Sequence, residues 1–530
     1  NSSIDLEFLA LFPSSITDDQ ADSVRNYINN RNNVFDLKDG FGYYFFDPQI
    51  FPIVSPAAFV SFWGGNIVGS DNTLNASVSQ STVNDQPTRD GYKVTFNDNA
   101  DHLVVASPLS GGQAGWQIVG TSLGTFVYRV DNDAVTELNL LGNLGNASYR
   151  KAGDLYGIIL LPESATGVDI EQARKLLIDR GASDAAEGSN YYGAWYQRND
   201  IVEFKDFNMP NVTQVGFAFS YLSSLLSFPA ISFPDCTALG SAFRNNTAMT
   251  NFGAIRAEKG VDFSNAWNLC SALTSFPAGA KLGTSASNVN FTSAWQSSGL
   301  TSFPALDLSN GNNFFNAFQG CSSLTTIDNG ILLGTAVTAA TVNFNSAFLG
   351  SGISSLPSNF DLSKGHIFFK TFMNCSALTS FPAGAQLGND ATDVNFTQAW
   401  RGSGLSSFST PLLKGKVFDQ TWRDCLSLAD FAADVFTNWN PTSITSGIFD
   451  KAWDGCSALT AQSVENILVS IDASGKYATT NGASGGTALG DAGIDIDYNT
   501  ATGSLSAATN TAVSSLKGRG WSIIVNNVTL

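Results

Sequence analysis

The stretch NFFNAFQGCSSL, at residues 313–324, carries the pattern that decides the fold of this chain. Two aromatic residues, Phe314 and Phe318, lie four positions apart and are followed by Cys321 and Leu324. The same pattern recurs from about residue 239 to residue 460. An offset of four places both rings on one face of a helical turn, so the sequence predicts one such turn in each copy. The aromatic pairs are Phe263/Trp267, Phe291/Trp295, Phe314/Phe318, Phe344/Phe348, Phe368/Phe372, Phe396/Trp400, Phe418/Trp422 and Phe449/Trp453.

The spacing between copies alternates. Copies with Cys at the third position after the second aromatic reach the next Leu one residue later than copies with Ser-Gly. The repeating unit is therefore a pair of coils, and Cys456 breaks the alternation at the last copy. The residues at this position are Cys270, Ser298, Cys321, Ser351, Cys375, Ser403, Cys425 and Cys456.

No single copy can bury its own rings, so the copies must stack. Coils stacked ~4.8 Å apart place each ring on the next and pair the short segments that follow, such as residues 273–277, into a ladder. Together with weaker copies at Leu239/Phe243 and Val215/Phe219, the pattern predicts a solenoid of about ten coils. Its predicted core consists of Phe263, Trp267, Phe291, Trp295, Phe318, Phe348, Phe372, Trp400, Trp422 and Trp453.

The six cysteines are predicted to stay reduced. Cys270, Cys321, Cys375 and Cys425 lie two coils apart, about 10 Å by the coil spacing, whereas a disulfide needs Cα atoms within ~7 Å. Only Cys425 and Cys456, in adjacent coils, could bridge. We interpret these side chains as small buried hydrophobic groups.

The repeats resemble a known family. The runs CSALTSFP at residues 375–382 and NFFNAFQGCSSL at residues 313–324 resemble BspA-type leucine-rich repeats of bacterial surface proteins. The sequences of these runs, together with LDLSNG at residues 306–311, are similar to repeats in structural proteins of marine cyanophages. The segment at residues 137–156 and the C-terminal end also resemble parts of phage virion proteins. The resemblance implies a leucine-rich-repeat solenoid and a virion role.

The flanking segments predict a mixed, β-rich chain with five parts. Residues 1–54 would form a helix and an aromatic strand, in which Tyr43, Tyr44, Phe45 and Phe46 are either buried or a subunit contact. The other parts are a β-sandwich or jelly-roll-like domain at 55–165, a helix (168–180) with a junction at 166–210, the solenoid at 211–460, and an α/β cap at 461–530. The cap is predicted to contain helices at 464–471 and 507–516 and strands at 494–498 and 521–525.

Composition and charge limit the partners. The chain has 530 residues, 27 Lys+Arg and 45 Asp+Glu, for a net charge of −18. Nucleic acids and anionic membranes bind clustered Lys and Arg, so neither is expected as a partner. No apolar run reaches the ~18–20 residues of a membrane span. Residue 1 is Asn rather than Met, which favours a processing site or a numbering that starts inside a longer chain.

Motifs for catalysis and metal binding are weak. Gly-x-Ser-x-Gly occurs around Ser122 and Ser484, but Ser122 lies in a predicted hairpin turn and no His follows Ser484. The two histidines, His102 and His366, have no neighbouring ligand at metal spacing. Asp495 and Asp497 alternate as in a calcium loop, but the glycine and distal glutamate of that loop are missing. We therefore predict no catalytic, cofactor or metal site, and no enzyme.

The functional expectation combines the repeats with the resemblance. Residues 261–460 contain no Glu, so the solenoid surface should be rich in Asn, Ser, Thr and Gly. The chain is expected to be a cyanophage-like virion protein of decoration or fibre type, assembled in the host cytoplasm. Its expected partners are other virion proteins, further copies of itself, and a host-surface glycan or protein. The alternatives are a secreted bacterial adhesin, favoured if a signal-peptidase site precedes Asn1, and a glycan-binding, lectin-like module.

Overall fold

A computed structural model describes residues 43–46, 66–68, 78–79, 88–90, 93–96, 103–105, 115–130, 137–138, 153–162, 167–179, 181–184, 190–205, 209–490, 493–496 and 506–530. The chain divides into two compact units. The first comprises Asn1–Cys236 and Asn245–Gly253, and the second Thr237–Arg244 and Ala254–Leu530. The predicted anchor helix within residues 1–40 lies outside the described residues.

The first unit is organised around a ten-stranded sheet. Its centre is the antiparallel hairpin of β7 (Gly115–Thr121) and β8 (Gly124–Val130), with Ser122 in the predicted turn. The other strands are β1 (Tyr43–Phe46), β2 (Asn66–Val68), β4 (Thr88–Asp90), β5 (Lys93–Phe96), β10 (Gly153–Pro162), β11 (Ile201–Phe204), β12 (Ser227–Phe228) and β14 (Asn251–Phe252). A separate antiparallel sheet contains β3 (Val78–Ser79), β6 (Leu103–Val105) and β9 (Glu137–Leu138). These strands confirm a β-rich region, whereas a sandwich or jelly roll stays a prediction.

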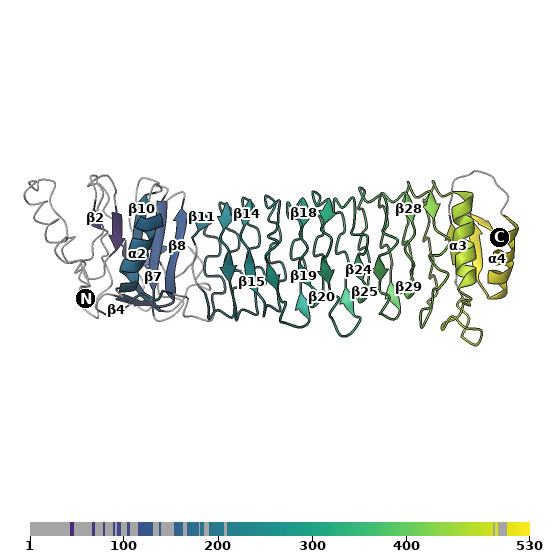
Figure 1. Cartoon of the computed structure of the whole chain (residues 1–530), viewed down its shortest axis with the longest axis horizontal. Helices are drawn as coiled ribbons and strands as arrows, with labels where there is room; N and C mark the ends of the chain where they lie inside the picture. The colour runs from purple at the N-terminus through teal and green to yellow at the C-terminus, as the bar shows by residue number, and fades with distance from the viewer. Residues whose placement is uncertain are drawn as a thin grey trace, which may run out of the picture. The chain divides into compact units, whose positions relative to one another are not determined.

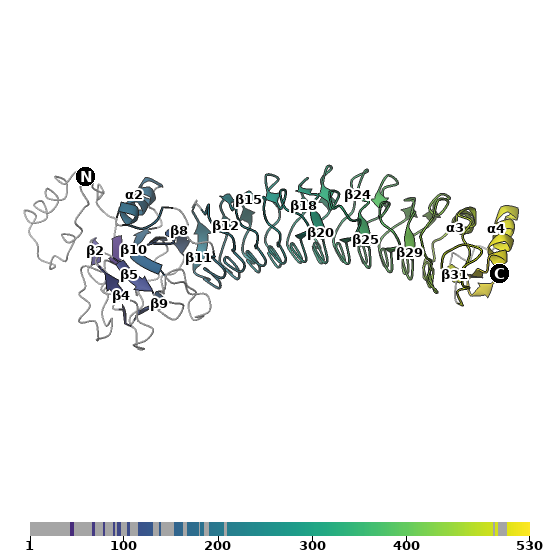
Figure 2. The same ribbon diagram turned by 90° about the horizontal axis from the view of Figure 1, so that it is seen from below.

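The sheet changes direction at β11. This strand pairs antiparallel with β8 and parallel with β12, which pairs parallel with β14. Figure 2 shows β8, β11 and β12 in succession. Helix α2 (Gly167–Asp179), close to the predicted 168–180, packs Leu177 against the hairpin. A Cβ at Gly120 would lie 2.7 Å from the Leu177 Cβ. Glycine at this position therefore allows the helix to approach the sheet closely.

The structure contains a β-solenoid of about nine turns, which confirms the repeat architecture. Figure 1 shows the coils of the second unit following one another. Their strand pairs are parallel, three of them with a register shift, and six of the strands form one sheet. The leucine-rich-repeat assignment itself stays a prediction.

The solenoid strands are short. In the first unit the coils contribute β13 (Ile231–Ser232) besides β12 and β14. In the second unit they are β15 (Ile255–Ala257), β16 (Lys281–Leu282), β17 (Val289–Asn290), β18 (Ser302–Phe303), β19 (Asp307–Leu308), β20 (Gly311–Asn313), β21 (Thr326–Ile327), β22 (Leu332–Leu333), β23 (Val342–Asn343), β24 (Asp361–Leu362), β25 (Gly365–Ile367), β26 (Gln386–Leu387), β27 (Val394–Asn395), β28 (Ser407–Phe408), β29 (Gly415–Val417) and β30 (Asp430–Phe431).

The aromatic pairs do not lie on helical turns, so that prediction is wrong. Each pair begins two successive four-residue β-turns. In one coil, Ala294 N donates to Phe291 O at 3.1 Å, and Ser298 N donates to Trp295 O at 3.1 Å. The third residue of each turn has a positive φ, 53° at Ser293 and 55° at Ser297, which is the signature of a type II turn. Two turns in sequence repeat every four residues and so produce the spacing that a helix also produces.

Alternate residues of these turns bond to the next coil. Phe291 N donates to Asn313 O at 2.8 Å, and Trp295 N donates to Ala317 O at 2.9 Å. The backbone N–H and C=O groups that have no partner within the turns are thereby hydrogen-bonded, as buried backbone groups must be. Equivalent residues of successive coils consequently lie directly above one another.

This register stacks the rings into two ladders. From Phe243 to Trp453, centroids of successive second aromatics are 5.1–6.2 Å apart, and their planes differ by 1–9°. From Phe263 to Phe449, the first aromatics stack at 5.1–5.5 Å. All ten residues of the predicted core are at most 1 % exposed. Because such burial contributes roughly 2–3 kcal/mol per ring, the ladders dominate the stability of the solenoid.

Glycine explains the shorter coils of the two-coil unit. Gly352 N donates to Cys321 O at 3.1 Å, and a Cβ at Gly352 would lie 2.2 Å from Ser322 O. Gly299 and Gly404 occupy the same position, with a backbone oxygen 2.1 Å from the added Cβ. The coil that lacks one residue must therefore pass against the backbone of the coil before it.

We expect Gly352→Ala to lower the free energy of unfolding by about 1–3 kcal/mol, since the new methyl group overpacks against backbone that cannot move aside. Gly279→Ala is the matched control, because its nearest contact would be the Ala254 Cβ at 3.5 Å. Urea titrations of both variants measure the effect. Equal stability of the two variants would contradict this account of coil length.

The last part of the second unit ends the ladders. Helix α3 (Ala461–Ala473) starts at the N-cap Thr460 and lies against β30. Ser463 Oγ accepts from Phe431 N at 2.9 Å, and Asn466 Nδ2 donates to Phe431 O at 2.7 Å. These side chains satisfy backbone groups at the open edge of β30. They therefore act as a cap for this edge of the solenoid.

A second helix and three strands complete this part. They are β31 (Gly493–Ile496), α4 (Ala507–Gly518), β32 (Ser522–Val525) and β33 (Val528–Thr529). Strand β31 continues the parallel stacking through a bridge between Phe449 and Ile494 and pairs parallel with β32. Trp521 packs its ring 6.1 Å from that of Phe449. Both predicted helices and both predicted strands are present, with boundaries shifted by a few residues.

Candidate functional site

The residues that follow the stacked aromatics recur from coil to coil in the second unit, some of them half-buried and some, such as Asn268 and Ser293, buried. We define the turn face as the first and second residues after each stacked aromatic. The residues that directly follow the second aromatic form its central column. From coil to coil this column contains Arg244, Asn268, Gln296, Gln319, Leu349, Met373, Arg401, Arg423 and Asp454. After Arg244, its composition changes from amide to apolar to charged.

The amide section is bonded side chain to side chain. Asn268 Nδ2 donates to Gln296 Oε1 at 3.0 Å, and Gln296 Nε2 donates to Gln319 Oε1 at 2.9 Å. Each amide nitrogen carries two N–H groups and each oxygen accepts two bonds, so each bond leaves capacity for a ligand. Asn268 is buried, whereas Gln296 and Gln319 are half-buried. The ladder thus fixes the orientation of the two glutamines while keeping donors and acceptors available on them.

The apolar section occupies the middle coils. Phe315, Leu349, Phe369 and Met373 are all half-buried. Lys370 Nζ lies 4.7 Å from the centre of the Phe369 ring, within the range of a cation–π contact. Large apolar side chains are therefore partly exposed next to the amide section.

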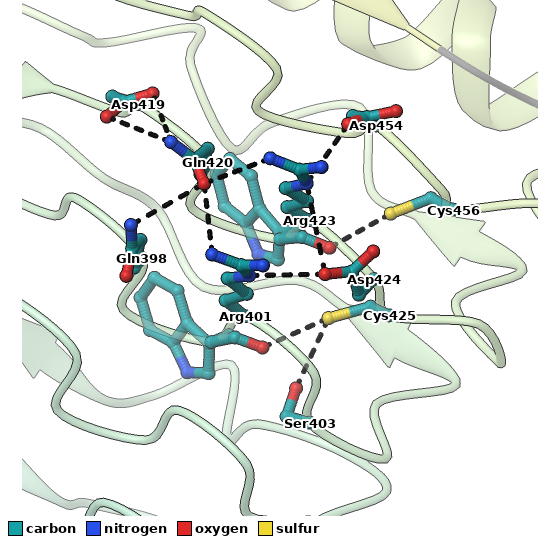
Figure 3. A network of polar contacts seen from close by, with 12 residues as sticks. Gln398, Arg401, Ser403, Asp419, Gln420, Arg423, Asp424, Cys425, Asp454 and Cys456 are labelled. Carbon is teal, nitrogen blue, oxygen red and sulfur yellow. Dashed lines mark hydrogen bonds and ion pairs between the residues drawn. The ribbon is translucent and has the colours of Figure 1, made fainter.

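The charged section lies at the C-terminal coils, and Figure 3 shows its contacts. Gln420 Oε1 accepts from Arg401 Nη1 at 3.1 Å and from Arg423 Nη1 at 3.2 Å. Arg401 pairs with Asp424 at 3.1 Å, and Arg423 pairs with Asp454 at 3.0 Å. The four charged side chains are 29–48 % exposed, so solvent screens these pairs and each contributes little to stability. Their charges are compensated within the surface itself.

Asp419 borders this charged section. Burial raises its pKa, and Asp450 on the next coil raises it further. Gln420 opposes the shift, because its Nε2 donates to Asp419 Oδ1 at 3.3 Å. The fold thus disfavours the ionised form of Asp419.

A column of thiols and hydroxyls lies in the interior. Cys425 Sγ donates to Trp400 O at 3.1 Å and is 3.4 Å from Ser403 Oγ (Figure 3). The same pattern recurs at Cys321 with Ser298 and at Cys375 with Ser351. Burial raises the pKa of Cys375 and Cys425 to about 11. The alternation of Cys and Ser along the sequence therefore corresponds to a bonded column in the core.

We expect all six cysteines to react as free thiols only after unfolding. A thiol reagent at pH 8 should label almost none in the native chain, because reaction needs the thiolate and burial suppresses it. Since the folded-state pKa is raised, the stabilisation is complete below the unfolded pKa of ~8.5 and is lost as pH rises towards 11. Thiol counting in guanidinium tests this; two or fewer of the six would overturn it.

The other sequence-predicted positions lie on separate elements. Tyr43–Phe46 forms β1, which pairs with β10 and β2. His366 lies in β25, Ser484 in a loop, and Asp495 in β31, whereas His102 and Asp497 lie outside the described residues. In the described part of the chain, no group of three His, Cys, Asp or Glu side chains could hold a metal ion. None of the described helices is long and apolar enough to cross a membrane.

Sequence reasoning missed the turn face. Its residue types differ from coil to coil, so no single motif marks it. A fixed offset of one residue after the second aromatic identifies the central column once the register is known. The family models searched, the curated proteins and the solved structures all gave no match to this chain.

Proposed function

We propose that this chain is a non-enzymatic structural protein of a cyanophage-like virion, of the decoration or fibre type. It acts in particle assembly, in attachment to the host surface, or in both. The observation that carries the proposal is the architecture of the second unit. Ladders of aromatic rings and thiols fill the core of its stacked coils, and the side chains of its turn face are arranged in columns. The resemblance of the repeats to phage structural proteins supplies the biological setting.

The charge of the chain determines how it associates. At a net charge of −18, copies of the chain repel one another at long range, and salt screens that repulsion. Contacts with other virion proteins and with further copies must therefore rely on apolar burial and on hydrogen bonds from Asn, Gln, Ser and Thr side chains. We propose a homo-oligomer or array, in the virion, whose contact includes the segment around Tyr43, Tyr44, Phe45 and Phe46.

Sizing at low and high salt tests this assembly. The intact chain should form an oligomer at micromolar concentration that persists as salt rises, because screening acts on charge and not on apolar burial. Deletion of residues 1–40, which lie outside the described residues, should weaken the oligomer. A monomeric intact chain, or an oligomer that dissociates with salt, would contradict the assembly proposal and favour the secreted adhesin.

A further inference from the structure

The amide and apolar sections of the turn face lie side by side without a charged residue between them. From Ser264 to Phe369, every residue that directly follows a stacked aromatic is Ser, Asn, Thr, Gln, Phe or Leu, and the second residues after each aromatic add Asn, Leu, Ser and Gly. The charged residues that border this stretch are Arg244 on the coil before it and Lys370 at its end, whose Nζ lies over the Phe369 ring. In a chain with a net charge of −18, an uncharged stretch across several coils indicates an uncharged partner.

The aromatic side chains of this stretch are regularly spaced. Phe315 and Phe369 both follow the first aromatic of their coil, and Asn345 holds the same position on the coil between them. The two rings are therefore two coils apart, about 10 Å by the ~4.8 Å spacing of parallel strands. Both are half-buried, and Lys370 Nζ lies 4.7 Å from the centre of the Phe369 ring. They provide two fixed apolar platforms with an amide between them.

The neighbouring amides are held ready for bonding. Gln296 is fixed on both sides, by Asn268 Nδ2 at 3.0 Å and by Gln319 Oε1 at 2.9 Å. These bonds leave one N–H of Gln296 and both N–H groups of Gln319 unused, because a primary amide has two. A site built to bond hydroxyls in this way loses little conformational entropy on binding, since its side chains are already ordered.

We propose that the turn face from Gln296 to Phe369 binds an uncharged polysaccharide. Sugar rings offer flat C–H faces to aromatic platforms and hydroxyls that both donate to and accept from amides. A polysaccharide is a polymer with a regular repeat, which suits a protein surface whose binding side chains recur from coil to coil. A protein partner is less well matched, because a neutral amide column offers neither a deep apolar pocket nor charge complementarity. This inference rests on the proposed attachment function and names the class of partner.

The test is affinity electrophoresis of the full chain in native gels that contain dextran, laminarin or hydroxyethyl cellulose. We expect at least one gel to retard the chain. Phe315→Ala and Phe369→Ala should each weaken that retardation about tenfold, and Gln296→Glu, which puts a charge into the amide ladder, should do the same. Leu332→Ala is the control: Leu332 is 40 % exposed and lies on β22, outside the turn face. Thermal melts confirm that each variant is folded.

The outcomes separate this inference from the proposed function. No retardation in any of the three gels overturns the inference, and so does an equal loss with Leu332→Ala. Retardation only by a sulfated polysaccharide such as carrageenan, abolished by salt, overturns it as well, because Lys370 and the arginines would then be responsible. In each of these cases a chain that is still found in virus particles leaves the proposed structural role intact.

Discussion

Replacing Trp295 by Ala is expected to lower the free energy of unfolding by about 3–5 kcal/mol. The indole is fully buried. It stacks between Trp267, at 5.5 Å and 7°, and Phe318, at 5.1 Å and 5°, and Phe303 meets its edge at 4.9 Å. Removing it leaves a cavity between coils that depend on each other for burial, so neighbouring coils should melt with it. A denaturant titration followed by circular dichroism measures the change.

Trp295→Phe is the matched control. Trp295 Nε1 has no hydrogen-bond partner in the described structure, and Phe318, Phe348 and Phe372 occupy the same position in other coils. Exchange for phenylalanine therefore removes an unpaired buried N–H and keeps the stacking, so we expect a cost below about 1.5 kcal/mol. A cost below ~1 kcal/mol for Trp295→Ala would mean that the ring is exposed and that the assigned register is wrong.

Removal of residues 461–530 is the second change with a large expected effect. It takes away Trp521, which packs on Phe449 and Trp439, and it strips the ladder edge of β30 of its partners in α3. An open edge above exposed aromatic rings is a template for pairing with other chains. We expect the truncated chain to aggregate or to associate end to end, which light scattering and size-exclusion chromatography would detect.

Point variants of the cap distinguish the loss of hydrogen bonds at the edge of β30 from the removal of the whole segment 461–530. Ser463→Ala and Asn466→Ala each leave a backbone group of Phe431 without its partner, which should cost about 1–3 kcal/mol, while the rings stay covered. We expect the solubility of both variants to equal that of the intact chain. A truncated chain that is as soluble as the full chain would show that residues 461–530 are no cap.

The sequence was sufficient to predict the stacking but not the local geometry. An offset of four residues arises from a helical turn and equally from two successive four-residue turns. Glycine distinguishes the two geometries. The third residue of the second turn is Gly320, Gly350, Gly402 or Gly455 in four coils, and each of these glycines has a positive φ. Glycine adopts this backbone region without strain, and a type II turn requires it there.

The C-terminal part was predictable because its signals are local. Thr460 and Ser506 are N-caps whose side chains accept from the backbone N–H three residues on, and the apolar residues of both helices follow the helical period. The predicted start of α3 was late, since Ala461, Gln462 and Ser463 form a first turn without an apolar stripe. Thr460 alone marked that boundary.

The turn face could not be predicted because it depends on register across the whole solenoid. Gln420 lies beside Arg401 and Arg423 only because coils of unequal length are aligned in register. That alignment depends on Gly352 and its equivalents, which pack against the backbone of the preceding coil. Residues so far apart in sequence share no local motif. Only the turn geometry, which the helical interpretation missed, shows which of them face outward together.

Mass spectrometry of purified virus particles tests the central proposal most directly. Particles of a phage that encodes this chain would be banded on a density gradient, and their peptides compared with those of the uninfected host's surface and secreted fractions. The account predicts that peptides from residues 211–460 co-purify with the particles, at an abundance comparable to other structural proteins. Absence of these peptides from particles, together with their presence in the surface or secreted fraction of uninfected cells, would contradict it and identify the chain as an adhesin.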